Sequence, residues 1–396
     1  MGYRSRRLAA VLIFPLIAVL FTAACGGSSR LHEVTVYAGS LKENLVGLSC
    51  RQQVLIYLPP SYRYGGERRY PVLYFLPGYD DPVWTFTGGA LQGFRLRDSM
   101  DRLLSRGQIG EMIVVLPSGS TPLGGTFYVN SPVLGQWEDY VSQDLVEYVD
   151  SHFPTLRCPS GRAIAGTTAG GSGALILAMH HPDVFGSIYA LDPVLLRPGA
   201  MDGAGLCDQV EMNRLVSLQQ DWSRLPQRRA RLSLTLFLQA RLGSSAESEH
   251  LQAFFVAMGA AFSPDPDNRG LPIRLPCRRT AGGLAPDPTA RAAFEAGLGG
   301  WLDKIVRYGP NLRRLRLIAL DYGTDTGIHW LPEGCIYLAD LLASSGIPHR
   351  RLAHAGDQED LFRERMEGFL LPIVSEVLHA QKQDLGSVGQ PAGSGE

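Results

Sequence analysis

The sequence has little lysine and no excess of charge of either sign. Only Lys42, Lys304 and Lys382 among its 37 basic residues are lysines, and the formal net charge of the 396-residue chain is -1. Because proteins that bind nucleic acid carry an excess of basic residues, this balance argues against nucleic acid as a partner. Glycine and proline, at 45 and 26 residues, stay below the roughly 25–30% that is typical of low-complexity chains.

Signatures of bound metals and cofactors are absent as well. No CxxC or HxxxH spacing occurs, which argues against a zinc site. No phosphate-binding loop or dinucleotide fingerprint is present either, so the sequence implies no cofactor. Hydrophobic residues make up 45% of the chain. These observations together favour a globular protein with a large core.

Long apolar runs are missing, except for one at the start of the chain. Arginines at positions 4, 6 and 7 precede the run from Leu8 to Phe21, and small residues follow it up to Cys25. This arrangement is typical of a secretory signal. The run is shorter than the ~20 residues that a membrane-spanning helix needs. We therefore expect a signal peptide over residues 1–24 and an extracytoplasmic protein.

The segment Ala23-Ala24-Cys25-Gly26 resembles a bacterial lipobox, in which the cysteine becomes the lipidated first residue after cleavage. Thr22 is a departure, because lipoboxes usually carry leucine there, and Thr22 with Ala24 also suits an ordinary signal peptidase. Lipid anchoring at Cys25 is the preferred interpretation, with simple secretion and an uncleaved anchor as alternatives. Residues 25–32 would then form a linker to the folded domain.

Five further cysteines lie at positions 50, 158, 207, 277 and 335. Disulfides persist outside the cytoplasm, so one or two pairs are compatible with export. Cys207 and Cys277 bracket one helical region and are the first candidates for a pair. The sequence alone does not determine the pairing.

Short apolar strands alternate with helical segments along most of the chain. The pattern predicts strands at 54–58, 72–76, 112–116, 162–165, 187–191, 315–320 and 350–354, and helices at 138–153, 170–181, 334–343 and 360–378. Strands alternating with helices imply a mostly parallel sheet covered on both faces, and apolar strands of this length are typical of burial on both sides. The predicted fold class is α/β, in one domain over residues 33–380.

An insertion interrupts this alternation at about residues 194–309. Its first half has helical character, at 208–242 and 247–261, whereas residues 262–288 are rich in proline, aspartate and arginine and lack regular periodicity. We expect a helical cap over the carboxyl edge of the sheet, and a peripheral decoration without a ligand role is the alternative. Residues 381–396 are expected to be a disordered tail.

A glycine-rich turn near the middle of the chain is the candidate functional site. The segment Arg162-Ala-Ile-Ala-Gly166-Thr-Thr-Ala-Gly170-Gly171 joins a predicted strand to a predicted helix. That context is the one required of a G-x-S-x-G nucleophile elbow. The glycines permit a strained turn that lifts one side chain above the sheet, close to backbone N–H groups.

Several segments resemble the putative-esterase family of α/β hydrolases, which includes esterase D-like enzymes (S-formylglutathione hydrolases) and the mycolyltransferases. The segments, between about Val54 and Leu378, are LIYLPPSY, YPVLYFLPGYDD, FYVNSPVLGQWEDYV, DLVEYVDSHFP, RAIAGTTAGGSGALILAMHHPDVFGS, FSPDPDN, GTDTG and GIPHRRLAHAGDQ. The resemblance implies an α/β-hydrolase fold with a mostly parallel central sheet, helices on both faces and a helical cap insertion. It also implies descent from an ester hydrolase or acyltransferase.

All three positions of the family's catalytic triad differ in this chain. The elbow, which usually reads G-H-S-M-G-G in the family, has Thr168 at the nucleophile position. The G-T-x-D motif after a late strand has Thr326 at the acid position, with Asp325 beside it, and the G-x-H pattern before the last helix has Gln358 at the base position. The resemblance therefore identifies a triad-degenerate member.

The chemistry of the triad explains why these replacements matter. A hydroxyl nucleophile needs an adjacent base, and a third group must orient that base. Gln358 has no accessible change of protonation, and the branched side chain of Thr168 is restricted in χ1. We therefore predict loss of ordinary serine-hydrolase activity. A substitute base stays open as an alternative, with His354 and His329 as candidates because both lie beside the expected carboxyl edge.

Other parts of the family's site are better preserved. The backbone N–H groups of Tyr79 and Ala169 occupy the positions of the usual oxyanion donors of this fold. Four aromatic side chains on neighbouring loops could form a platform for a sugar or acyl group, and ordinary core packing is the alternative for each of them. They are Trp84, Phe86, Tyr128 and Trp137.

Three functions compete on this basis. The preferred hypothesis is a pseudo-esterase lipoprotein, held at a bacterial membrane through Cys25, that binds a small ester, acyl or glycan ligand in the former active site. The second is an active carboxylesterase or acyltransferase that uses Thr168 with a non-standard base. The third is a structural partner of another envelope protein.

Overall fold

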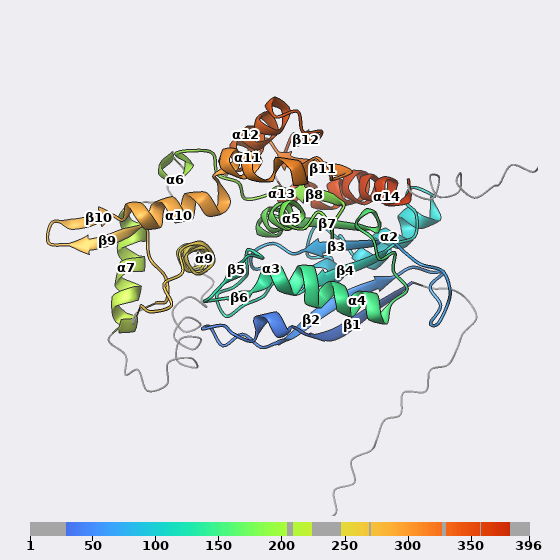
Figure 1. The fold of residues 1–396 in the computed structure, drawn as a ribbon, viewed down its shortest axis with the longest axis horizontal. Coiled ribbons are helices and arrows are strands. Elements are labelled where there is room, and N and C mark those ends of the chain that lie inside the picture. The colour runs from blue at the N-terminus through green and yellow to red at the C-terminus, as the bar shows by residue number, and fades with distance from the viewer. Residues whose placement is uncertain are drawn as a thin grey trace, which may run out of the picture.

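Eight strands form the central sheet in the order β1-β2-β4-β3-β7-β8-β11-β12 (Figure 1). The computed structural model describes residues 29–203, 209–223, 247–268, 271–326, 330–356 and 358–380. The strands are β1 (Arg30–Tyr37), β2 (Arg51–Leu58), β3 (Val72–Leu76), β4 (Ile113–Pro117), β7 (Arg162–Thr167), β8 (Ser187–Leu191), β11 (Leu317–Gly323) and β12 (Arg350–His354). β4, β3, β7, β8, β11 and β12 run parallel, whereas β2 pairs antiparallel with both β1 and β4.

Helices cover both faces of the sheet, which explains why inner strands such as β3 and β4 are apolar throughout. Along β3, Val72, Tyr74 and Leu76 pack into one layer and Leu73 and Phe75 into the other. The first layer contains α3 (Trp137–Asp139), the π turn η2 (Tyr140–Asp144), α4 (Leu145–His152), α5 (Ala169–His180), α11 (Trp301–Leu312) and α12 (Trp330–Ser344). The second contains α1 (Thr85–Gly88), α2 (Leu96–Ser105), α13 (Gln358–Arg365), the π turn η5 (Met366–Leu370) and α14 (Leu371–His379).

The predicted strands are present, and so are the predicted helices as far as the described residues reach; residues 224–242 of the helix expected at 208–242 lie outside them. Several described elements were not predicted, among them β1, α2 and α11. β1 was missed because it is an edge strand whose side chains are mostly exposed or half-buried, so it lacks an apolar run. It begins at Arg30, inside the segment that was expected to be a linker. The amphipathic α2 and the hairpin β9 (Cys277–Thr280) and β10 (Gly283–Pro286) were also missed. The remaining described elements are short. They are the 3₁₀ turns η1 (Gly39–Leu41) and η3 (Pro159–Gly161) and the two-residue strands β5 (Asn130–Ser131) and β6 (Gly135–Gln136).

The insertion forms a cap at the end of the sheet where the parallel strands finish (Figure 1). Its described elements are α6 (Ala200–Gly203), α7 (Gln209–Ser223), α9 (Glu247–Phe262), β9, β10 and α10 (Pro288–Leu298). Phe254 of α9 packs edge-on against Tyr79, which follows β3, with 5.1 Å between ring centroids. Trp301 and Ile305 of α11, at the end of the expected insertion, line a small cavity together with Leu175 of α5 and Ile318 of β11, so α11 packs on the sheet.

Several segments for which the sequence analysis made a prediction lie outside the described residues. These include the signal segment 1–24, Cys25, the tail 381–396 and Cys207, so the Cys207–Cys277 pair stays a prediction. Cys50, Cys158 and Cys335 are free thiols. Within the described ranges, no helix is both long and apolar enough to cross a membrane.

Candidate functional site

The candidate site lies between β3 and β7, where the order of the strands changes direction. From β3 the chain continues to β4 on one side, and from β7 it continues to β8 on the other. β3 and β7 are neighbours in the sheet, although many residues separate them in the sequence. The loops that leave their carboxyl ends diverge, so a crevice forms at such a point in open α/β sheets. The loop Pro77–Gly78–Tyr79 follows β3 there, and Thr168 follows β7.

The turn from β7 into α5 has the backbone of a nucleophile elbow. Thr168 has φ 47° and ψ -115°, a conformation that is strained for a β-branched residue. A β-carbon on Gly166 would lie 2.3 Å from the carbonyl oxygen of Gly170, and one on Gly170 would lie 2.2 Å from that of Leu76. Only glycine fits at either position, so the close approach of β3, β7 and α5 explains both glycines.

The Thr168 hydroxyl is half-buried and makes no hydrogen bond to the described residues. A β-carbon on Gly78 would lie 2.3 Å from Thr168 Oγ1 and 2.5 Å from Asp81 Oδ2. The hydroxyl and this carboxylate therefore lie on the same side of Gly78. The Gly78 N–H donates to Asp81 Oδ2 at 3.2 Å, which holds the carboxylate in the loop. The sequence analysis did not single out Asp81.

The two expected oxyanion donors lie on the two loops that leave β3 and β7 at this point. Ala169 is the first residue of α5, where backbone N–H groups have no partner within the helix. Tyr79 is fixed by its hydroxyl, which donates to the carbonyl of Leu123, and by its ring, which contacts Phe254. Among the described residues, neither the Tyr79 nor the Ala169 N–H donates a hydrogen bond. Both remain suited to bind an acyl oxygen.

The acid and base positions lie on turns at the same edge of the sheet. Thr326 is buried and Asp325 is exposed in the turn after β11. This turn is tied to β12, because the Thr324 N–H donates to the carbonyl of His354 at 2.8 Å. Gln358 is the first residue of α13, which follows β12. His329, one of the two candidate substitute bases, lies outside the described residues.

His354, the other candidate base, points away from the crevice. Its Nε2 lies 3.1 Å from Asp321 Oδ1, and its ring packs edge-on against Phe369 of η5, in the second helical layer. β12 is three strands away from β7, which corresponds to about 14 Å at the usual strand spacing. The contact of His354 with Asp321 does not favour a relay to Thr168, and the role of His354 as a substitute base stays a prediction.

A buried charge network holds the segment that surrounds His354. Arg365 of α13 donates to Asp192 Oδ2 at 2.5 Å and to Asp321 Oδ1 at 2.6 Å. The Gly323 N–H donates to Asp192 Oδ1 at 2.8 Å, and the Tyr189 hydroxyl donates to Asp321. Burial raises the pKa of Asp192, and the neighbouring Arg365 opposes that rise. The network joins α13 to the ends of β8 and β11.

Sequence reasoning missed this network, although one signal was available. Asp192 directly follows the apolar strand β8, and Asp321 lies inside the otherwise apolar β11. A carboxylate is rarely buried unless it is paired. Two such carboxylates could therefore have predicted a buried cation, but not that the cation is Arg365.

Of the four expected platform residues, only Trp84 is exposed, at 62%. Phe86, Tyr128 and Trp137 are fully buried, so the platform interpretation is wrong for these three. Phe86 packs against Phe75 and Phe362, and Tyr128 packs against Trp137. The Tyr128 hydroxyl donates to the carbonyl of Pro77 at 2.9 Å. This hydrogen bond from a buried side chain holds the loop after β3 in place.

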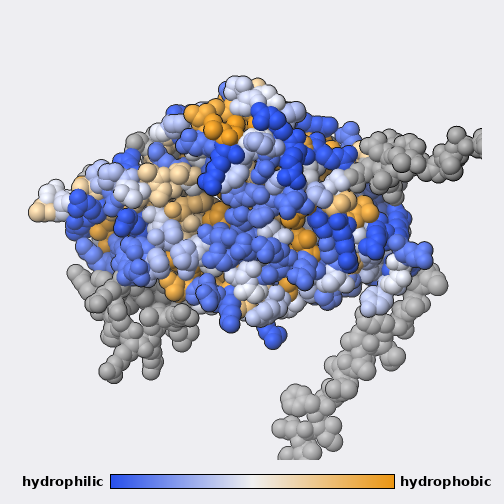
Figure 2. Space-filling view, viewed as in Figure 1, coloured by the Kyte–Doolittle hydropathy of each residue, from blue (hydrophilic) through white to orange (hydrophobic). Residues whose placement is uncertain are grey.

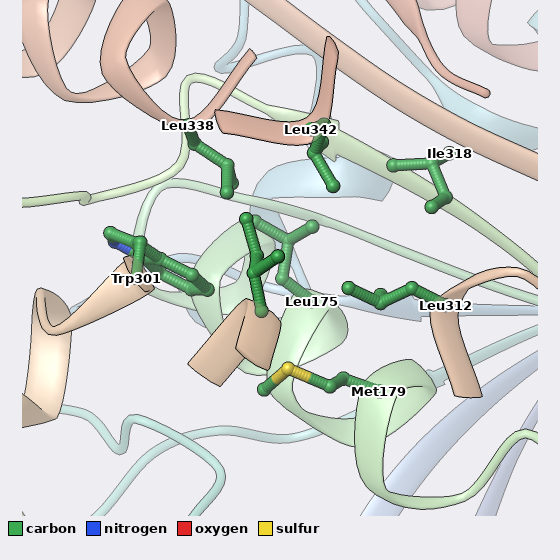
Figure 3. A pocket seen from close by; sticks show the side chains of 8 residues that line it. Leu175, Met179, Trp301, Leu312, Ile318, Leu338 and Leu342 are labelled. Atoms are coloured by element: carbon green, nitrogen blue, oxygen red, sulfur yellow. The ribbon is translucent and has the colours of Figure 1, made fainter. Parts of the chain in front are cut away.

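A small cavity lies elsewhere, between α5, α11, α12 and β11 (Figure 3). Its volume is about 10 Å³, at the lower limit for a single water. Only apolar side chains line it: Leu175, Met179, Trp301, Ile305, Leu312, Ile318, Leu338 and Leu342. It is a packing defect of the core without groups for chemistry. The described residues also contain no cluster of three or more side chains that could hold a metal ion.

Comparison with known proteins agrees with this geometry. Residues 46–230 match a family described as putative esterase. A solved ferulic acid esterase superimposes with a TM-score of 0.55 at 19% identity, covering 89% of this chain and 100% of its own. An S-formylglutathione hydrolase from Agrobacterium tumefaciens gives a TM-score of 0.48 at 15% identity, covering 90% and 98%. The first of these likenesses supports the α/β-hydrolase fold.

Proposed function

From the match of residues 46–230 to the putative esterase family, we propose that the chain is an exported member of this family that binds a ligand at the former active site without hydrolysing it. The observation that carries this proposal is the missing base at Thr168. The family's base position is Gln358, and Nε2 of His354 lies beside Asp321. A threonine hydroxyl without a base is a poor nucleophile at neutral pH.

Binding is supported by the groups that remain at the crevice. The N–H groups of Tyr79 and Ala169 are suited to the carbonyl oxygen of an ester or acyl group. Trp84 offers an exposed aromatic surface on the loop that leads from Tyr79 into α1. We expect a small ester or acyl ligand, such as the feruloyl group that the similar ferulic acid esterase is named for. The exported form is a lipoprotein anchored through Cys25.

Hydrolysis of nitrophenyl acetate and butyrate tests the loss of catalysis. The wild-type chain should give the same rate as Thr168→Ala, and a fluorophosphonate probe should leave no adduct on either. Thr168→Ser serves as a matched variant, because it supplies the primary hydroxyl but no base. It should also stay at the background rate. Activity that Thr168→Ala abolishes would refute the proposal.

Calorimetry with methyl ferulate tests ligand binding. The wild-type chain should bind this probe, and Trp84→Ala should weaken binding at least several-fold, whereas the exposed Tyr64→Ala on the opposite edge should bind as the wild type does. Equal affinity in all three proteins, or no binding by any, would contradict the proposed use of the crevice.

An active threonine hydrolase is the second candidate, and one observation favours it. The Asp81 carboxylate lies next to the Thr168 hydroxyl on the same side of Gly78. A carboxylate in this position could accept the hydroxyl proton, as carboxylates do in other general-base mechanisms. This candidate predicts a nitrophenyl ester hydrolysis that both Thr168→Ala and Asp81→Asn abolish. Asp81→Asn keeps an acceptor for the Gly78 N–H, so it preserves the loop.

A further inference from the structure

The first described strand begins at the edge of the sheet opposite to the candidate site. Arg30 at the start of β1 pairs with Leu58 at the end of β2, and Tyr57 in turn pairs with Val114 near the start of β4. The chain therefore enters the domain at the amino edge, where the parallel strands begin. Thr168 and Tyr79 follow the carboxyl ends of β7 and β3, and the cap lies at the same edge (Figure 1).

The amino edge is strongly basic, although the whole chain is nearly neutral. Six segments lead into the parallel strands, and together they contain eight arginines, no lysine and three carboxylates. These segments are residues 59–71, 106–112, 153–161, 181–186, 313–316 and 345–349. All eight arginines are exposed, as is Arg30. At the opposite edge, the loops that directly follow β3 and β11 carry Asp80, Asp81 and Asp325, and the arginines there lie after β8 and on the cap.

Little of this positive charge is neutralised by the protein itself. Among the described residues, Arg68 alone of the nine forms an ion pair with a carboxylate, that of Glu111 at 2.7 Å. Arg63 and Arg69 hydrogen-bond to backbone carbonyls, which leaves their charge uncompensated. Tyr64 lies in the same loop and is 93% exposed. An exposed aromatic ring among basic residues is typical of a membrane interface.

We propose that the amino edge rests on a bilayer surface of anionic headgroups, so that the candidate site faces away from the membrane. The proposal rests on the lipid anchor at Cys25, which is part of the proposed function. Cys25 is five residues before Arg30, and five extended residues reach about 17 Å. An anchor on so short a segment brings the bilayer to the edge where β1 starts, and this is the basic edge.

Sedimentation with lipid vesicles tests this surface without the anchor. The protein used is residues 26–396, which keeps every described residue and whose folding is checked by its thermal transition. It should bind vesicles that contain phosphatidylglycerol and not vesicles of phosphatidylcholine alone, and salt should release it. The triple variant Arg30→Glu, Arg106→Glu and Arg314→Glu should lose at least about tenfold in binding.

A second triple variant provides the matched control. Arg274→Glu, Arg278→Glu and Arg279→Glu change the net charge by the same amount, but these exposed arginines lie on the cap. This variant should bind within about twofold of the parent protein. Equal loss in both variants, no loss in either, or equal binding to neutral vesicles would overturn the proposal. So would RNA or heparin binding that vesicles fail to displace.

Mass spectrometry of the full chain, extracted from membranes, separates this proposal from the anchor on which it rests. Acyl groups on Cys25 together with the expected vesicle result support both. An unmodified Cys25 would refute the lipoprotein assignment and, with it, the argument from the short segment. Acylated Cys25 with vesicle binding that the amino-edge variant does not reduce would refute the docking surface alone.

Discussion

At the scale of single residues, Thr168 combines a strained backbone with a hydroxyl that has no hydrogen-bond partner among the described residues. Its φ of 47° places a β-branched side chain in a region that favours glycine. In a working elbow such strain is part of the mechanism, because it exposes the nucleophile. In the proposed pseudo-esterase, which has no matching base, the same strain only reduces stability.

Replacing Thr168 by glycine should therefore stabilise the fold. Strain at such a position costs about 1–3 kcal/mol, and glycine removes it at the loss of a half-buried side chain. We expect a net gain of about 1 kcal/mol, which corresponds to about 2 °C in Tm for a domain of this size. Thermal unfolding measures it.

The neighbouring Thr167 provides the control for this prediction. It is buried in β7 with ordinary strand geometry, so Thr167→Gly should lower the Tm because glycine weakens a strand. A Tm that falls equally in Thr167→Gly and Thr168→Gly would contradict the role of strain.

At the scale of elements, the network of Arg365, Asp192 and Asp321 connects α13 to the carboxyl ends of β8 and β11. All three side chains are almost fully buried. Removing one partner of a buried ion pair leaves a charge without compensation, which costs about 3–5 kcal/mol. The network therefore fixes the segment that carries the acid and base positions of the family.

Arg365→Met should destabilise the protein by about 3–5 kcal/mol near pH 7, measured by urea unfolding. Burial already raises the pKa of Asp192, and loss of the guanidinium raises it further. A carboxyl group with a raised pKa in the folded state stabilises that state below its unfolded pKa, and this contribution is lost as the pH rises through the folded pKa. The cost should therefore shrink as the pH falls toward 4.

The double variant Asp192→Asn and Asp321→Asn in the Arg365→Met background controls for the charges. It contains no buried carboxylate, so its difference from wild type should not decrease toward pH 4. A pH-independent cost in Arg365→Met itself would show that packing, and not charge, determines the effect.

The sequence predicted the sheet and the elbow because both depend on local patterns. Apolar runs bounded by proline and glycine are sufficient to place β3 or β8, and the spacing of Gly166 and Gly170 is sufficient to place the turn. The network could not be predicted in the same way, because Arg365 meets Asp192 across 173 residues. The burial of Trp137 and Tyr128 could not be predicted either, since tryptophan and tyrosine occur both in binding loops and in protein cores.

At the scale of the whole molecule, the cap and the sheet meet through a small aromatic cluster. Phe254 of α9 contacts both Tyr79 and Phe127, at 5.1 and 5.4 Å between ring centroids. Phe262 also contacts Phe127 at 5.2 Å. Since Tyr79 belongs to the candidate site, the position of the cap and the shape of the crevice depend on each other.

Phe254→Ala should loosen the cap while the sheet stays folded. Phe254 is half-buried, so we expect a cost of about 2 kcal/mol, below the range for a fully buried phenylalanine. Hydrogen exchange of the amides in α9 should accelerate by at least about tenfold, and that of β7 should change little. Phe94→Ala, in the layer on the other face of the sheet, should instead accelerate exchange in both. Equal acceleration in both variants would contradict a separable cap.

The distribution of charge is another property that only the whole molecule shows. A net charge of -1 argued against a polyanionic partner, yet the arginines gather at one edge once the loops before six strands come together. Composition averages over the whole chain, so a basic edge is hidden by acidic residues that lie elsewhere. The local surface, and not the total, determines which partner is attracted.

The position of β1 also determines how the domain responds to mechanical load. A pull on the chain before Arg30, directed away from the amino edge, acts along the axis of β1. Eight residue pairs join β1 to β2, so such a force shears the whole ladder at once and does not peel it pair by pair. The Ser29 hydroxyl also donates to Asp101 of α2. The proposed anchor at Cys25 would therefore hold the domain at the point where its edge strand resists extension best.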